Sequence, residues 1–463
     1  MPYADWQALA YLLAGSLFVL GLRGFTHPVS ARRGNYLAMA GMVIAIIATI
    51  GAPEVKAYGF IVTGIVIGGV IGTVIARRIA MTAMPQLVAL LHSFVGLGAV
   101  LVALGTYLTH AHGGAPGAVL RAELGIGALI GAVTFTGSLV AFGKLQALLS
   151  TRPLLFPGRH LVNLALFVLA LAATVHFVGG GSFATLVLLA VLAALLGVLL
   201  ITPIGGADMP VIVSMLNSYS GWAAAATGFT LHNDLLIIVG ALVGFSGAIL
   251  SYIMCRAMNR SIVSVVLGGF GGGDAAAAAA AASGDRPVRV AAVEDAAFLM
   301  DNASKVFIVP GYGMAVAQAQ HALNELREML GEKGIEVKFA IHPVAGRMPG
   351  HMNVLLAEAD VPYEQVVEME EVNPEFSACD VALVVGANDV TNPAAKTNKA
   401  SPLYGMPILE VYKARHVLFI KRSMKPGYSG VDNELFYRDN CALVFGDAKA
   451  VCEKLVAELR GRH

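Results

Sequence analysis

The run K-V-F-I-V-P-G-Y-G-M-A-V-A-Q-A-Q, from Lys305 to Gln320, decides the fold of the C-terminal part of the chain. An apolar, β-branched stretch leads into a turn with two glycines, and a helix-forming stretch follows. This order is typical of the first strand, turn and helix of a dinucleotide-binding fold. The run comes after roughly 250 residues of membrane-grade hydrophobic sequence. Either a nucleotide regulates transport here, or redox chemistry at a nucleotide drives it.

The composition agrees with this division. Hydrophobic residues make up 57% of the 463 residues, charged residues make up 13%, and the mean hydropathy is +0.72. These values are too apolar for a soluble protein of this length. The net charge of +1 gives no indication of nucleic-acid binding, and we expect no such partner. The four cysteines form no C-x-x-C pair and no metal-ligand spacing, so we expect reduced thiols and no metal site.

Nine apolar segments are long enough to cross a hydrocarbon core, which needs about 20 helical residues. They cover residues 4–22, 35–52, 57–76, 84–109, 124–148, 160–178, 183–202, 208–229 and 235–255. One set of connecting loops holds nearly all the Lys and Arg, and the alternate set offers only Lys56 and Arg121. By the positive-inside rule, the basic loops and the C-terminal domain face the cytoplasm and the N-terminus faces outward.

Several spans carry glycines at helix-packing spacing, such as Gly64, Gly68 and Gly72 in the third span and Gly127 and Gly131 in the fifth. Small residues at this spacing let membrane helices approach closely. We therefore expect a tightly packed helical bundle.

Polar residues inside the spans are candidates for an ion pathway. His92 lies deep in the fourth span, and histidine exchanges protons near neutral pH. A histidine satisfied by a neighbouring helix is the alternative. Ser214, Asn217 and Ser218 share one face of the eighth span, and Thr134 and Ser138 share a face of the fifth; residues of this kind also hold helices together. Asp208, before Pro210, is expected to cap the eighth span at its cytoplasmic end.

Three regions follow from these patterns: a membrane domain at 1–260, a Gly/Ala-rich tether at 261–287, and an α/β domain at 288–463. In the last region strands and helices alternate, which predicts a doubly wound, Rossmann-like parallel sheet. The expected strands cover 306–309, 335–341, 381–385, 417–420 and 443–445, and the expected helices cover 314–331 and 447–459.

The first turn of this domain is the predicted nucleotide site. Its glycines permit a tight turn and close approach of a pyrophosphate to the helix that follows. The residues predicted to bind the cofactor here are Gly311, Tyr312, Gly313, Ala315 and Val316. An ordinary glycine turn is the alternative.

The second strand runs into His342-Pro343 and lacks the acidic residue that binds an NAD ribose. Lys421, Arg422 and Ser423 follow a later strand and offer charge and donors suited to a 2′-phosphate. The sequence therefore favours NADP(H) over NAD(H), although a basic strand end on a surface is also common.

Two further loops are less specific. The run G-A-N-D-V-T-N-P holds Asn388 and Asp389 directly after a strand, where Asp389 is either functional or a turn residue. The glycine-rich run 345–353 holds Arg347, which either reaches a pyrophosphate or belongs to a structural turn.

Taken together, these motifs resemble the β subunit of the bacterial two-subunit proton-translocating NAD(P)+ transhydrogenase. The resemblance covers nearly the whole length. It is carried by L-H-S-F-V-G-L-G, G-G-A-D-M-P-V-I-V-S-M-L-N-S-Y-S-G-W, P-G-Y-G-M-A-V-A-Q-A-Q, H-P-V-A-G-R-M-P-G-H-M-N-V, G-A-N-D-V-T-N-P-A and K-R-S-M-K-P-G-Y-S-G-V-D-N-E-L-F. The alanine-rich tether departs from the more polar segment expected of the family.

The resemblance implies a bacterial inner-membrane protein that works with an α subunit, in an α2β2 assembly. The α subunit would bind NAD(H) and supply the remaining spans, and this chain would bind NADP(H) and hold most of the proton channel. Hydride would pass directly between the two nicotinamides while a proton crosses the membrane.

The resemblance also implies roles for individual residues. It implies proton translocation for His92 and Asn217, with Ser138, Asp208 and Gly247 near the channel or its coupling region. It implies 2′-phosphate binding for Lys421, Arg422 and Ser423. Tyr428, Arg347 and Asp389 would line mobile loops around the nucleotide, which would lie reversed relative to ordinary dehydrogenases.

The sequence is also compatible with two other functions. One is a nucleotide-gated ion transporter whose α/β domain senses redox state; a selectivity-filter loop or a row of in-membrane acids would favour it, and neither is visible. The other is a dehydrogenase merely attached to lipid, which would not need nine spans.

Overall fold

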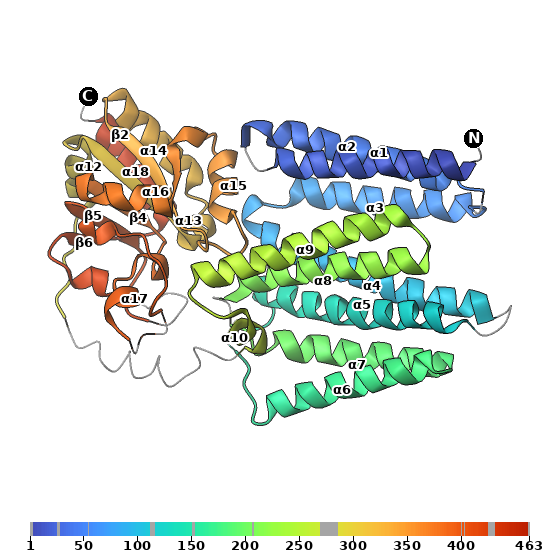
Figure 1. Ribbon diagram of the computed structural model, residues 1–463. Coiled ribbons are helices and arrows are strands. Elements are labelled where there is room, and N and C mark those ends of the chain that lie inside the picture. Colours follow the sequence, from blue (N-terminus) through green and yellow to red (C-terminus); the bar gives the residue numbers. More distant parts are fainter. Residues whose placement is uncertain are drawn as a thin grey trace. The chain divides into compact units, whose positions relative to one another are not determined.

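Long helices form the N-terminal part of the protein and an α/β domain forms the C-terminal part (Figure 1). The computed structural model describes residues 3–25, 28–53, 55–111, 116–150, 153–205, 208–268, 286–399, 401, 403–424 and 431–461. Most of the predicted tether, including the alanine run, lies outside these residues. Its first part contains a short helix, α10 (Ile262–Leu267).

Nine long helices occur in the described residues up to 257. They are α1 (Tyr3–Gly24), α2 (Pro28–Ile50), α3 (Tyr58–Arg78), α4 (Met84–Ala111), α5 (Ala118–Leu145), α6 (Arg159–Val178), α7 (Phe183–Ile201), α8 (Met209–Thr230) and α9 (Asp234–Ala257). Each overlaps one predicted span, although α2 and α5 begin six or seven residues earlier than predicted. By length and composition, eight of these helices are apolar enough to cross a membrane, and α8 is the exception. The chain is therefore a membrane protein.

The low hydropathy of α8 has a structural reason. From Met209 to Thr230, only Trp222 and Phe229 are exposed, so this helix is the most enclosed by its neighbours. Polar side chains are tolerated at membrane depth where protein rather than lipid surrounds them. The polar face of α8 is thus compatible with a helix inside the bundle.

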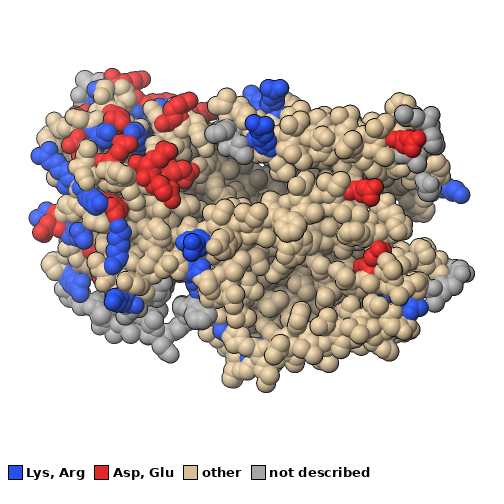
Figure 2. Space-filling view, in the orientation of Figure 1, with Lys and Arg blue, Asp and Glu red and all other residues tan. Residues whose placement is uncertain are grey.

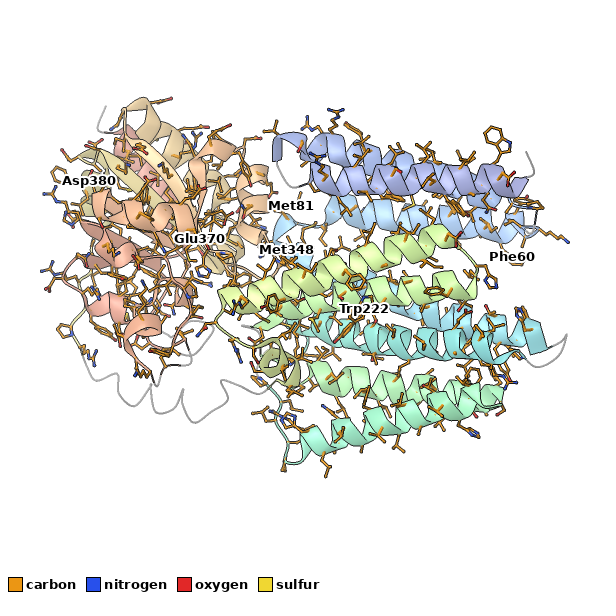
Figure 3. All side chains as sticks on the ribbon, viewed as in Figure 1. Phe60, Met81, Trp222, Met348, Glu370 and Asp380 are labelled. Atoms are coloured by element: carbon orange, nitrogen blue, oxygen red, sulfur yellow. The ribbon has the colours of Figure 1, made fainter. Side chains whose placement is uncertain are left out.

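Glycines bring particular helices into backbone contact. A Cβ on Gly96 of α4 would lie 2.6 Å from the carbonyl oxygen of Gly131 of α5. On α8, a Cβ on Gly221 would lie 2.8 Å from the Gly240 oxygen of α9, and Trp222, labelled in Figure 3, covers Gly244. The predicted close packing holds for these pairs.

The glycine row of α3 behaves differently. No described atom lies within 4 Å of a Cβ built at Gly64, Gly68 or Gly72, and α3 has no buried residue. Within the described chain this row does not serve helix packing, contrary to the expectation from its spacing.

The C-terminal domain contains a six-stranded, fully parallel sheet in the order β3-β2-β1-β4-β5-β6. The strands are β1 (Lys305–Pro310), β2 (Glu336–Ile341), β3 (Val366–Glu368), β4 (Val381–Val385), β5 (His416–Lys421) and β6 (Cys441–Phe445). The chain reverses direction across the sheet between β1 and β4, the switch point at which such sheets bind ligands. The predicted Rossmann-like class is confirmed.

Helices cover both faces of this sheet (Figure 1). One core cluster joins the sheet to α12 (Val293–Asp301), α13 (Tyr312–Ala317), α14 (Gln320–Glu332), α15 (His351–Glu358) and α18 (Ala448–Arg460). The other cluster joins it to α16 (Met369–Val372) and the short turns η4 (Asn373–Ala378), η6 (Val411–Lys413) and η7 (Glu434–Tyr437). Both clusters are built from residues after 287. On the face seen in Figure 2, charged side chains gather over this domain and leave the sides of the long helices largely bare.

The continuous helix predicted at 314–331 is wrong. Gln318 adopts a left-handed conformation, with φ of 52°, and separates α13 from α14. The N–H of Ala319 bonds to the Met314 oxygen and that of Gln318 to the Ala315 oxygen. This is the bonding of a Schellman helix end, formed here without the usual glycine.

Candidate functional site

The glycine turn after β1 packs directly against the loop after β4. The N–H of Gly311 donates to the Val385 oxygen at 2.9 Å, and the N–H of Gly313 donates to the Gly386 oxygen at 3.1 Å. A Cβ on Gly313 would lie 2.6 Å from the Cα of Gly386, so no side chain fits between the two loops. The two glycines therefore join neighbouring strand ends, and their N–H groups are already used by the protein.

The other residues of this turn differ in how far their side chains are buried. The Ala315 side chain is fully buried in the core, whereas Val316 is exposed. Tyr312 is half-buried and contacts Arg347, from the loop after β2, and His351, the first residue of α15.

Arg347, Tyr312 and His351 form a cluster beside this turn. The Arg347 guanidinium lies 4.2 Å from the centre of the Tyr312 ring, and the rings of Tyr312 and His351 are 6.2 Å apart. The backbone N–H of Arg347 donates to Nδ1 of His351 at 3.0 Å, so the neutral ring carries its proton on Nε2. Burial, with a smaller effect of the Arg347 charge, lowers the pKa of His351 to about 4.

Two donors of this cluster are buried and have no hydrogen-bond partner among the described residues. They are Nε of Arg347 and Nε2 of His351. Buried polar atoms of folded proteins are almost always bonded, so these two donors are available to hydrogen-bond acceptors of a ligand or of water. The predicted loop at 345–353 ends here, because α15 begins at His351.

A second cluster lies where β4 and β5 end. Nζ of Lys421 is buried, has no hydrogen-bond partner among the described residues, and lies 4.2 Å from the centre of the Phe436 ring. Burial lowers the pKa of Lys421, and the carboxylates of Asp432 and Asp389 oppose that effect. A buried ammonium group without a hydrogen-bond acceptor is costly, and an anionic ligand would relieve that cost.

The loop after β4 is fixed by amide side chains. Nδ2 of Asn388 donates to Oδ1 of Asp389 at 3.0 Å, and Asn433 donates to the Asn388 carbonyl oxygen at 2.9 Å. Oδ1 of Asn388 is buried without a partner among the described residues. Asn388, Asp389 and Lys421 thus meet at one edge of the sheet, as their positions after adjacent strands predict.

Three further predicted cofactor-binding residues, Arg422, Ser423 and Tyr428, come after Lys421 in the chain. Arg422 and Ser423 are exposed. Tyr428 lies outside the described residues.

His342 directly follows β2, at the position where an NAD-binding site carries an acidic residue. Its Nε2 donates to the Pro407 oxygen at 2.9 Å and its Nδ1 accepts from the Val344 N–H at 3.2 Å. Both ring nitrogens are therefore used internally, and burial lowers the pKa of His342 to about 4. This position offers no carboxylate to a ribose.

In the helical part, His92 is joined to α8 through Ser220. Nδ1 of His92 and Oγ of Ser220 are 3.1 Å apart, and Ser220 donates to the Asn217 carbonyl oxygen at 2.7 Å. Nε2 of His92 is buried without a partner among the described residues. The structure thus links the predicted residues His92 and Asn217 through a serine that sequence reasoning missed, although its spacing of three residues from Asn217 marks the same helix face.

Ser138 and Asp208, two other residues predicted for the channel region, are not part of the hydrogen bonds described above for His92. Oγ of Ser138 is buried without a hydrogen-bond partner among the described residues. The carboxylate of Asp208 accepts from Nη1 of Arg260 at 2.6 Å. This pairing spans 52 residues, and no local pattern predicts it.

Comparison with known proteins agrees with both parts of the chain. The family model described as "NAD(P) transhydrogenase beta subunit" matches residues 7–458. A protein of Rhodospirillum rubrum named "NAD(P) transhydrogenase subunit beta" is 60% identical over 452 residues, which cover 96% of this chain and 97% of the relative. The protein of the same name from a designated strain of that species is equally similar. The chain belongs to the NAD(P) transhydrogenase beta subunit family.

Proposed function

We propose that this chain binds NADP(H) in its C-terminal domain and conducts protons through its helical domain. An α subunit binds NAD(H), and the two subunits together couple hydride transfer to proton movement. Family membership supports an oxidoreductase subunit that uses a nicotinamide nucleotide and works with an alpha subunit. The assignment of NADP(H) to this chain goes further and depends on its own residues.

The buried ammonium group of Lys421 carries the cofactor assignment. It lies at the carboxyl edge of the sheet, near the switch point, with no hydrogen-bond acceptor among the described residues. A 2′-phosphate supplies the negative charge and the oxygen acceptors that would pair with this ammonium group. NAD(H) has no such phosphate, and His342 offers it no carboxylate in exchange.

Other buried polar atoms without hydrogen-bond partners among the described residues have a chemistry suited to the remaining groups of the nucleotide. Arg347 and His351 present buried donors suited to pyrophosphate oxygens, and Asn388 presents an acceptor. Arg422, Ser423 and Tyr428 follow Lys421 in the chain and complete the proposed phosphate-binding segment. Asp389 lies near Lys421, and Tyr312 packs against Arg347. When bound, the nicotinamide supplies the hydride chemistry, and the protein needs only to orient it and exclude water.

The proposed proton path involves His92, Asn217, Ser138 and Asp208. The buried Nε2 of His92 is an open proton acceptor, and the buried hydroxyl of Ser138 is a further polar atom without a partner among the described residues. Asp208, paired with Arg260, belongs to the cytoplasmic end of α8 in the proposed topology. The distribution of Lys and Arg supports an N-terminus on the outer side of the membrane, and we propose that this membrane is the bacterial inner membrane. We further propose an α2β2 assembly.

Titration calorimetry of this chain, purified without its α subunit, tests the cofactor assignment. We expect NADP(H) to bind this subunit well ahead of NAD(H). Lys421→Ala is expected to weaken NADP(H) binding by about 1.5–3 kcal/mol, the value of a charge-assisted hydrogen bond, and to leave NAD(H) binding unchanged. The matched control is Lys449→Ala, an exposed lysine on α18 that faces Glu453. Equal affinity of the unmodified subunit for NAD(H) and NADP(H) would refute the assignment.

A further inference from the structure

We propose that Ser220 is a positioning residue that holds the proton of neutral His92 on Nδ1 and so reserves Nε2 for proton uptake. This inference rests on the proposed proton-conducting role of His92. It assigns a role to a residue that neither the family resemblance nor the span pattern identified.

The direction of the hydrogen bonds follows from the chemistry of the three groups. The Asn217 carbonyl oxygen only accepts, so the Ser220 hydroxyl donates its single proton there, at 2.7 Å. The Ser220 oxygen then has lone pairs but no proton left for the imidazole. Because Nδ1 of His92 lies 3.1 Å from that oxygen, Nδ1 is the donor. The neutral ring is therefore the Nδ1–H tautomer.

This tautomer leaves the lone pair on Nε2. That atom is buried and has no hydrogen-bond partner among the described residues. A proton that arrives at Nε2 produces the imidazolium, in which both nitrogens are donors. The bond from Nδ1 to Ser220 is the same before and after, so uptake and release at Nε2 require no rearrangement around Nδ1.

The serine also stabilises the charged form. Its oxygen points a lone pair at the ring, and a hydrogen bond to an ionised group is stronger than one between neutral groups. Ser220 is itself buried and bonded to the backbone of α8, which fixes its orientation. A hydroxyl that rotated freely could donate to Nδ1 instead and move the ring proton to Nε2, which would close the proposed uptake site.

Nitrogen-15 NMR of the histidine-labelled α–β complex in lipid vesicles tests the tautomer without any variant of Ser220. The His92 signal is identified by its loss in His92→Ala. At a pH where the ring is neutral, we expect Nδ1 to be protonated and Nε2 not. A signal from the Nε2–H tautomer overturns the proposal.

Variants test the functional consequence in the same vesicles. Ser220→Ala is expected to remove the tautomer preference and to slow proton-coupled hydride transfer about tenfold, because a buried N–H loses its acceptor. Ser220→Thr keeps the hydroxyl and is expected to keep both the tautomer and most of the rate. The matched control is Thr227→Ala on the same helix, whose hydroxyl bonds to the Ala223 oxygen.

The outcomes separate this inference from the proposed function. If His92→Ala pumps protons at the normal rate, the proposed role of His92 fails. If His92→Ala is inactive while Ser220→Ala is normal, or while Ser220→Thr is as impaired as Ser220→Ala, only the role of Ser220 fails.

Discussion

Gly313 and Gly386 meet backbone to backbone at the carboxyl edge of the sheet, and the N–H of Gly313 donates to the Gly386 oxygen at 3.1 Å. Gly386 also has a φ of +68°, which side-chain-bearing residues rarely adopt. This contact joins the turn after β1 to the loop after β4 and so holds the two sides of the switch point together.

We predict that Gly386→Ala destabilises the C-terminal domain by about 2–4 kcal/mol, since it adds overpacking to backbone strain. Gly334→Ala is the control for strain alone: its φ is +79°, but open space surrounds the position, so about 1 kcal/mol is expected. Gly331→Ala, in the helix α14 with open space, should stabilise by about 0.5–1 kcal/mol. Urea unfolding of residues 288–463 measures all three, and equal losses for the first two variants would contradict the packing argument.

Residues 288–463 are predicted to form an independently folding domain. Both core clusters of the sheet are built from residues after 287, so we expect the fragment to fold alone and to unfold cooperatively. A fragment without a cooperative transition or native secondary structure would contradict this.

Acid should destabilise the same domain through His342. Its pKa is about 4 in the folded state and 6.5 in the unfolded state, so the unfolded chain binds the extra proton first. The stability that His342 contributes is present above pH 6.5 and is lost as the pH falls toward 4. Between about pH 7.5 and pH 5, the loss should be about 2 kcal/mol for this residue. His342→Gln, which keeps a donor and an acceptor but does not titrate, should flatten the dependence by that amount.

Gln318 stores backbone strain that glycine would relieve. It is exposed and left-handed at the end of α13. Gln318→Gly should stabilise the domain by about 0.5–1 kcal/mol, after the larger entropy of glycine in the unfolded chain is deducted. Ala317→Gly, one residue earlier and helical, should instead destabilise by about 0.5–1 kcal/mol. Thermal unfolding of both variants measures the contrast, and a loss in both would refute the strain.

Much of the fold followed from the sequence because its signals are local. The nine long helices coincide with apolar segments, and alternating patterns located five of the six strands. The strand β3 has only three residues and too short a pattern to detect. The break at Gln318 was missed because a Schellman end without glycine leaves no mark in the sequence.

The candidate site was only partly predictable. Strand order explains why Asn388, Asp389 and Lys421 meet, since the first two follow β4 and Lys421 ends the adjacent strand β5. The contacts of Tyr312 with Arg347, of Arg260 with Asp208 and of Ser220 with His92 depend on tertiary packing. Patterns along one segment carry no information about such pairs.

Proton-coupled hydride transfer in sealed vesicles that contain this chain and its α subunit tests the central claim most directly. With NADH, NAD+, NADPH and NADP+ present, one charge crossing about 150 mV releases about 3.5 kcal/mol, which would shift the NADPH/NADP+ ratio roughly 300-fold relative to NADH/NAD+. We predict that shift for the unmodified complex, and its loss with a proton-conducting ionophore or in His92→Ala. The same nucleotide ratios with and without the imposed proton gradient would contradict coupling between the two domains of this chain.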